Sequence, residues 1–99
     1  MLDIKKTVSD GRTELILEGR LDAVTAPELD AAWKGAQDGT TELILDCAGL
    51  EYISSAGLRV FLSAQKTMSK RGSMKVIHVN DMVMEIFEVT GFTDILTIE

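Results

Sequence analysis

One stretch of the chain, residues 43–68, constrains the fold more than any other, because the spacing of its apolar residues changes partway along it. It starts with the apolar run Leu43-Ile44-Leu45, which is typical of a strand buried on both faces. From Leu58 onward, apolar residues recur every three or four positions, a spacing that predicts an amphipathic helix. Ser54 and Ser55 lie between the two patterns. The sequence therefore places two hydroxyl groups where a buried strand leads into a helix.

The start of a helix has a specific chemistry, because its first backbone amides lack partners within the helix and the helix dipole adds partial positive charge. Ser54 and Ser55 have two interpretations at such a position. In the first, a serine caps the helix by accepting a hydrogen bond from one of these amides. In the second, a serine is phosphorylated and its phosphate lies over the helix N-terminus. The residues alone leave both interpretations open.

The other patterns predict alternating strands and helices. Residues 2–8 are typical of an edge strand, and an Asp10-Gly11 turn joins them to an antiparallel strand over residues 15–17. Thr25 and Glu28 have the spacing of a capping box at the start of a helix. The elements expected later are a helix ending near Asp38-Gly39, a helix from Ser55 to about Lys70, a strand over 74–79, a helix from Asn80-Asp81 to Gly91, and a final strand over 95–98.

Strand-helix-strand connections of this kind produce parallel strands. We therefore expect one α/β domain over residues 1–99, with a mainly parallel sheet of about five strands, an N-terminal antiparallel hairpin strand and three to four helices. Parallel strands end at one edge of a sheet, and ligand sites lie there. Asp22, Asp46 and the two serines each follow a predicted strand. That edge is the expected site.

Composition narrows the classes of function. The net charge of −6 repels nucleic acid phosphates, so we expect no contact with DNA or RNA. No run approaches the ~20 apolar residues of a membrane span, and the N-terminus lacks the pattern of a signal peptide, so a cytoplasmic location is expected. Cys47 has no second cysteine to pair with and is expected to be buried. Trp33 and His78 are likewise expected to be structural residues, with His78 on its strand.

Two segments carry a resemblance to a known family. YISSAGLR at residues 52–59 and GRLDAVTAPEL at residues 19–29 are similar to the STAS domain of bacterial anti-sigma factor antagonists, and the order of predicted elements fits along nearly the whole chain. In that family a serine within an Asp-Ser-Ser/Thr-Gly-Leu motif is phosphorylated. Here Ser54 stands in the Asp position, Ser55 in the acceptor position and Ala56 in the Ser/Thr position. The resemblance implies that Ser55 is the phosphoacceptor, with Ser54 the second choice.

The resemblance also implies a function. In the family, the unphosphorylated protein binds a serine-kinase anti-sigma factor of the ATPase type and frees the sigma factor. Phosphorylation switches it off, and a phosphatase restores it. A monomer is expected, and the residues expected to contact the partner are Asp22, Ser54, Ser55, Ala56, Gly57 and Arg59. An alternative within the same fold is a non-phosphorylated adaptor subunit of a signalling scaffold or of a lipid-transport ATPase.

Two of these residues have further interpretations. Asp22 matches an aspartate of the family that lies near the phosphoacceptor, although a loop carboxylate that only caps a turn is equally compatible with the sequence. Gly57 is expected to allow close backbone approach in the first turn of the helix, where any side chain would intrude on the partner or on the serine hydroxyl. On that interpretation, Gly57→Ala leaves folding intact and weakens binding, because alanine favours a helix by up to ~1 kcal/mol.

Enzyme classes fit the residues poorly. A receiver domain with Asp46 as phosphoacceptor needs an acidic pair after its first strand, where this chain has Thr7-Val8-Ser9. A serine hydrolase needs a base within reach of the nucleophile, and the Gly-x-Ser-x-Gly motif is absent from the sequence. A Gly-rich phosphate loop is absent as well. We therefore expect a binding module with no catalytic residues, cofactor or metal ion.

Overall fold

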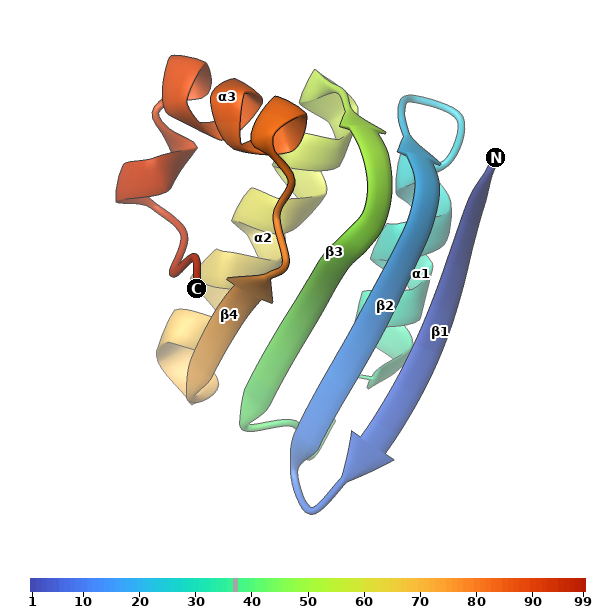
Figure 1. Ribbon diagram of the computed structural model, residues 1–99. Coiled ribbons are helices and arrows are strands. Elements are labelled where there is room, and N and C mark those ends of the chain that lie inside the picture. The colour runs from blue at the N-terminus through green and yellow to red at the C-terminus, as the bar shows by residue number, and fades with distance from the viewer. Residues whose placement is uncertain (37) are drawn as a thin grey trace.

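The computed structural model describes residues 1–36 and 38–99 and contains alternating strands and helices (Figure 1). The elements in chain order are β1 (Leu2–Ser9), β2 (Arg12–Leu21), α1 (Ala26–Ala36), β3 (Glu42–Ile53), α2 (Ser55–Arg71), β4 (Ser73–Ile77), α3 (Asp81–Thr90) and a short 3-10 helix (Phe92–Asp94). None of the helices in the described residues has the length and apolar character needed to cross a membrane.

The four strands form one sheet in the order β1-β2-β3-β4. β1 and β2 are antiparallel, whereas β2 pairs with β3 and β3 with β4 in parallel. The turn between β1 and β2 places Asp10 at φ 47° and Gly11 at φ 80°, the left-handed conformations that a two-residue hairpin turn requires. The predicted fold class, a mainly parallel sheet that begins with an antiparallel hairpin strand, is confirmed.

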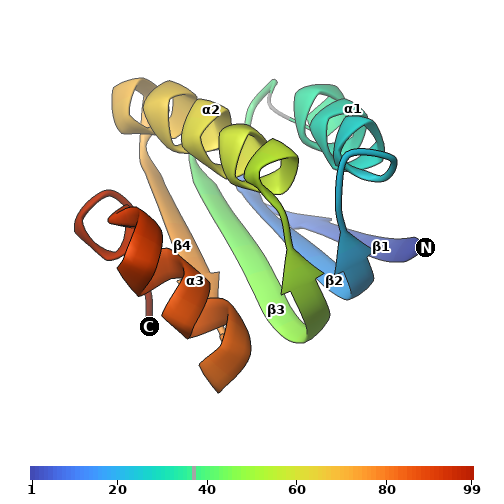
Figure 2. The ribbon, with the colours of Figure 1, turned by 90° about the horizontal axis from the view of Figure 1, so that it is seen from above.

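Two helices cover one face of the sheet. Figure 2 shows α1 and α2 side by side above it, with α3 beyond its β4 side. Alternate residues of β2, among them Leu15 and Leu17, are fully buried beneath the helices. Phe87 of α3 joins the same core, with its ring centroid 6.0 Å from that of Phe61 on α2. Trp33 of α1 is 2% exposed, so its predicted place in the core is confirmed.

The predicted final strand is wrong in extent. Residues 95–98 contribute one isolated bridge, between Ile98 and Val76 of β4. The chain leaves α3 through Gly91 in the left-handed conformation and at once makes the turn of 3-10 helix. Phe92 in that turn stacks on Phe87, with ring centroids 6.5 Å apart. This aromatic contact holds the segment against α3 and leaves few residues to extend the sheet.

The helix ends agree with the sequence in two cases and differ in one. Asn80 caps α3 by accepting a hydrogen bond from the Val83 amide at 2.8 Å, and Ser55 begins α2, as predicted. At α1, however, the Thr25 hydroxyl accepts from the Asp22 amide at 2.9 Å and donates to the Arg20 carbonyl at 2.8 Å. The buried Thr25 therefore ties the helix to the end of β2, and the predicted capping box with Glu28 is wrong.

Candidate functional site

The end of β2 and the start of α2 lie side by side. Leu21 and Ile53 are register partners at the last position of β2 and β3, and the Ser54 amide donates to the Leu21 carbonyl at 2.9 Å. This bond brings the loop after β2 against the first turn of α2. We call the two segments, residues 22–25 and residues 54–57, the serine rim. Of the residues expected to gather at this edge, Asp22, Ser54 and Ser55 lie in the rim, together with Ala56 and Gly57.

The two serines have different environments. Ser54 is the N-cap residue of α2, with extended backbone (φ −98°, ψ 177°), but its side chain makes no capping hydrogen bond. Its Oγ is buried and has no hydrogen-bond partner. Ser55, the first residue of the helix, is exposed. A large molecule such as a kinase can therefore reach the Ser55 hydroxyl directly, whereas the Ser54 hydroxyl is covered.

Asp22 organises its own loop. Its Oδ1 accepts from the amides of Val24 and Thr25 at 3.0 and 3.1 Å and from the Thr25 hydroxyl at 3.2 Å. The Thr25 amide contributes most to lowering the pKa of Asp22, with smaller contributions from the Val24 amide and the Thr25 hydroxyl that together outweigh the opposing effect of burial. Asp22 is thus an ionised residue that caps a turn, and it is half-buried at the rim.

Gly57 faces the interior of the protein. A Cβ at this position would lie 2.6 Å from Cγ of Leu21 and 2.9 Å from Cγ1 of Ile53, both fully or almost fully buried. The glycine therefore lets α2 approach the ends of β2 and β3 closely. This packing contradicts the expectation that Gly57→Ala leaves folding intact, because the added methyl group would enter the core.

A groove between α1 and α2 adjoins the serine rim. It has a volume of about 350 Å³ and includes small or apolar residues of both helices. Its charged residues are Asp30 on α1 and Arg59 on α2, and Ala56 joins it to the rim. Next to the groove, Val24 is 81% exposed at the tip of the loop after β2. Sequence reasoning had predicted Ala56 and Arg59 but missed Val24, because a single apolar residue in a loop carries no periodic signal.

A second feature near the rim was also missed. The guanidinium carbon of Arg20 lies 4.6 Å from the centroid of the Tyr52 ring, within the range of a cation–π contact. The two residues are register partners on β2 and β3, just before the strands end. Both occur in the segments that carry the family resemblance. The pairing of the strands, which is invisible in the sequence, brings them together.

Asp46 does not belong to the rim. β3 continues seven residues beyond it to Ile53, which corresponds to roughly 20 Å of strand. The expectation that Asp46 lies at the end of a strand is therefore wrong. Its Oδ1 instead contacts Nδ1 of His78 at 3.0 Å. His78 follows the end of β4 with φ 58° and is largely exposed, so its predicted place on the strand is wrong too.

Cys47 is fully buried, as predicted. Burial, with a smaller contribution from the charge of Asp46, raises the pKa of its thiol to about 12. The thiol therefore stays protonated at neutral pH and is a poor nucleophile. Among the described residues, no group of three or more His, Cys, Asp or Glu side chains is arranged to hold a metal ion.

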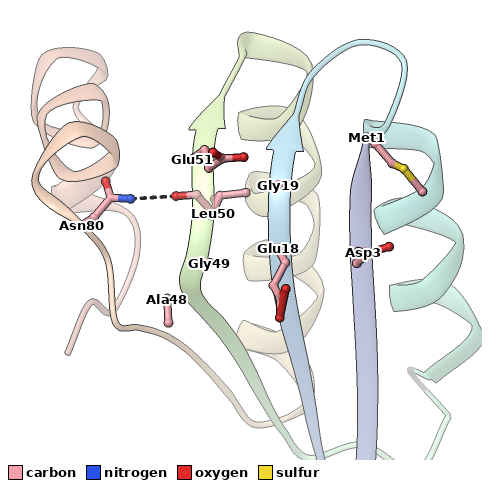
Figure 3. A pocket seen from close by; sticks show the side chains of 9 residues that line it. All are labelled: Met1, Asp3, Glu18, Gly19, Ala48, Gly49, Leu50, Glu51 and Asn80. Carbon is pink, nitrogen blue, oxygen red and sulfur yellow. Dashed lines mark hydrogen bonds between the residues drawn. The ribbon is translucent and has the colours of Figure 1, made fainter.

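Another hollow lies away from the serines. Figure 3 shows it on the face of the sheet opposite α1 and α2, bounded by β1, β2, β3 and the start of α3. Its volume is about 520 Å³, and Asp3, Glu18 and Glu51 contribute three carboxylates to its lining. None of the residues that line it is a lysine or arginine. This hollow contains no residue of the serine rim.

Comparison with known proteins identifies the family of the chain. A family model described as "Mlab, STAS domain" matches residues 4–97. The anti-sigma-B factor antagonist of Staphylococcus aureus (strain NCTC 8325 / PS 47) is 30% identical over 97 residues, covering 96% of this chain and 90% of the relative.

Two solved structures share the fold. An anti-sigma factor antagonist from Mycobacterium paratuberculosis has a TM-score of 0.89 at 21% identity, covering 99% of this chain and 85% of that one. The Bacillus cell fate determinant SpoIIAA in its phosphorylated form has a TM-score of 0.74 at 17% identity, covering 100% of this chain and 91% of that one. The chain thus belongs to the STAS domain family, and to the branch of it that contains the bacterial anti-sigma factor antagonists.

Proposed function

We propose that this protein is an anti-sigma factor antagonist controlled by phosphorylation of Ser55. The observation that carries the proposal is the exposed Ser55 hydroxyl at the first position of α2, in the acceptor position of the family motif. In this role the unphosphorylated protein binds a serine-kinase anti-sigma factor through the serine rim and frees the sigma factor. It acts as a monomer in the cytoplasm, without catalytic chemistry of its own, and a phosphatase resets it.

Two comparisons support the switch. The Staphylococcus aureus relative is named an anti-sigma-B factor antagonist and aligns along almost its whole length. SpoIIAA, which has the same fold, has been solved in a phosphorylated form. Ser54 is the weaker acceptor, because its Oγ is buried and a kinase would have to displace the start of α2 to reach it.

The switch needs no change of fold. Phosphorylation adds about −1.5 to −2 charges at pH 7, at a helix end where negative charge is favourable. The first turn of α2 contains no acidic residue that would oppose it. A partner that packs closely on the rim would, however, have to bury this charge, at a cost of several kcal/mol if it is left unpaired. Each 1.4 kcal/mol lowers affinity tenfold, so modification alone releases the partner.

The test combines site mapping with binding. The protein is incubated with the cognate kinase and ATP, and the phosphopeptide is sequenced. We expect phosphate on Ser55, and phosphate found only on Ser54 would contradict the assignment. Ser55→Ala should bind the anti-sigma factor as the unmodified protein does, and incubation with the kinase should not weaken this binding. Ser55→Asp should bind the anti-sigma factor at least tenfold more weakly than the unmodified protein. Ser69→Asp is the charge control, because it adds the same charge about 20 Å along α2.

One observation favours a second function, a non-phosphorylated adaptor subunit of a signalling scaffold or lipid-transport ATPase. The family model that matches is described as "Mlab, STAS domain" and does not mention a sigma factor. The motif also departs from the phosphorylated pattern at Ser54 and Ala56. An adaptor would bind its partner equally well as wild type, Ser55→Ala and Ser55→Asp, so the same titrations separate the two functions.

A further inference from the structure

We infer that Arg59 is the intramolecular partner of the phosphate on Ser55. This inference rests on the proposed function, because it concerns the modified state of the same serine. Ser55 and Arg59 are four residues apart on α2, and both are exposed. Side chains at this spacing lie on the same face of a helix with their Cβ atoms about 5–6 Å apart. Arginine at this distance can donate two parallel hydrogen bonds to phosphate oxygens.

The order of the two residues favours the pair. An acidic group four residues before a basic one is the more stabilising arrangement on a helix. The acidic group then lies nearer the positive N-terminal end of the helix dipole, and the basic group lies nearer its negative C-terminal end. Phosphoserine at the first position and arginine one turn later have this order. With no acidic residue in the first turn of α2, the phosphate would be the only anion that this turn supplies to Arg59.

The neighbouring acidic residues leave Arg59 available. Asp30, which faces it across the groove, forms an ion pair with Lys34 on its own helix at 2.8 Å. The Oδ1 of Asp22 is held by the amides of Val24 and Thr25. Within residues 1–36 and 38–99, none of the ion pairs identified includes Arg59. The unmodified protein therefore presents the arginine without a fixed carboxylate partner.

The pair would change two properties at once. Phosphorylation would add a dianion to the serine rim and would also draw the guanidinium of Arg59 away from the groove between α1 and α2. A partner that contacts this arginine in the unmodified protein would then lose that contact as well as meeting the phosphate. Arg59 is thus a positioning residue of the switch, which holds the phosphate over the helix end.

The test installs phosphoserine at position 55 during biosynthesis, so that it does not depend on a kinase. Phosphorus NMR then follows the second ionisation of the phosphate, whose ordinary pKa is about 6. A nearby arginine favours the dianion, so Arg59→Gln should raise the titration midpoint by roughly 0.15–0.4 pH units. Lys66→Gln is the matched control: it removes the same charge from the same helix, about 10 Å further on, and should raise the midpoint much less.

Arg59→Lys should have a titration midpoint close to that of the wild type, because it keeps the positive charge. An equal midpoint in wild type and Arg59→Gln, or an equal rise in Arg59→Gln and Lys66→Gln, would overturn the inference. Either result would leave the proposed function standing, because that function is judged by kinase mapping and partner titration. Conversely, a kinase that ignores Ser55 would remove the proposed function without changing the measured midpoints.

Discussion

At the scale of single residues, the two adjacent serines have distinct surroundings. Ser54 occupies the N-cap position but leaves its buried Oγ without a hydrogen bond, whereas Ser55 is exposed. A buried hydroxyl without a partner contributes no stability, because it has lost its bonds to water. The polar group that sequence reasoning would assign to capping therefore does not cap. The hydroxyl that is free to react is the one beside it.

This difference predicts the effect of Ser54→Ala. A serine that caps a helix contributes typically about 1 kcal/mol, but Ser54 makes no such bond, so the variant should change the free energy of unfolding by less than about 0.5 kcal/mol. Asn80→Ala is the matched control. Asn80 caps α3 and also donates to the Leu50 carbonyl at 2.7 Å, so its loss should cost about 1–2 kcal/mol. Urea denaturation measures both, and equal losses would contradict the structure.

At the scale of elements, α2 is seated by the contact of its first turn with the strand ends. Gly57 lets the helix backbone approach Leu21 and Ile53, and the Ser54 amide bonds to the Leu21 carbonyl. These contacts hold Ser55 in position relative to the loop after β2. The geometry of the serine rim therefore depends on close packing between a helix and two strands.

Gly57→Ala tests this dependence. Overpacking a core typically costs about 1–3 kcal/mol, which exceeds the gain of up to ~1 kcal/mol in helix propensity. We expect a net loss of about 1–2 kcal/mol in the free energy of unfolding. Gly35→Ala on α1 is the control, because a Cβ there meets no atom within 4 Å. It should stabilise the protein slightly, and a stabilising Gly57→Ala would show that the first turn of α2 has room to spare.

At the scale of the whole molecule, the proposed switch acts at one end of the four-stranded sheet. β3 runs through the middle of the sheet from Glu42 to the rim, with β2 and β4 paired on either side of it. Among the described strands, β1 lies at the far edge of the sheet and pairs with β2 (Figure 1). A charge added at Ser55 is locally favourable, so no element has reason to move.

We therefore predict that phosphorylation changes the surface and not the fold. Amide NMR spectra of protein with and without phosphoserine at position 55 should differ near residues 22–25 and in the first turns of α2. Signals of β1, from Leu2 to Ser9, should stay in place. The phosphorylated protein should also unfold at an equal or slightly higher temperature, because the added negative charge interacts favourably with the positive end of the helix dipole. Widespread changes that reach β1 would point to an allosteric switch instead.

The sequence by itself determined the order of the elements and the place of the two serines. The change of apolar period after residue 53 and the Asp10-Gly11 turn are local signals, and each survives in the structure because neighbouring residues alone specify it. The prediction of a final strand over residues 95–98 was wrong for the opposite reason. Their apolar alternation fits a strand, but Phe92 stacks on Phe87 in a 3-10 turn over Phe92–Asp94, and residues 95–98 then make one isolated bridge, from Ile98 to Val76.

Tertiary structure alone decided how the rim is built. The packing of Gly57 on Leu21 and the contact between Arg20 and Tyr52 both join residues more than 30 positions apart. The same applies to Asp46, which sequence reasoning put at a strand end because the apolar run stops there, although β3 continues to Ile53 by pairing with β2. Strand pairing and close packing create these relations, and neither has a period or a spacing along the chain.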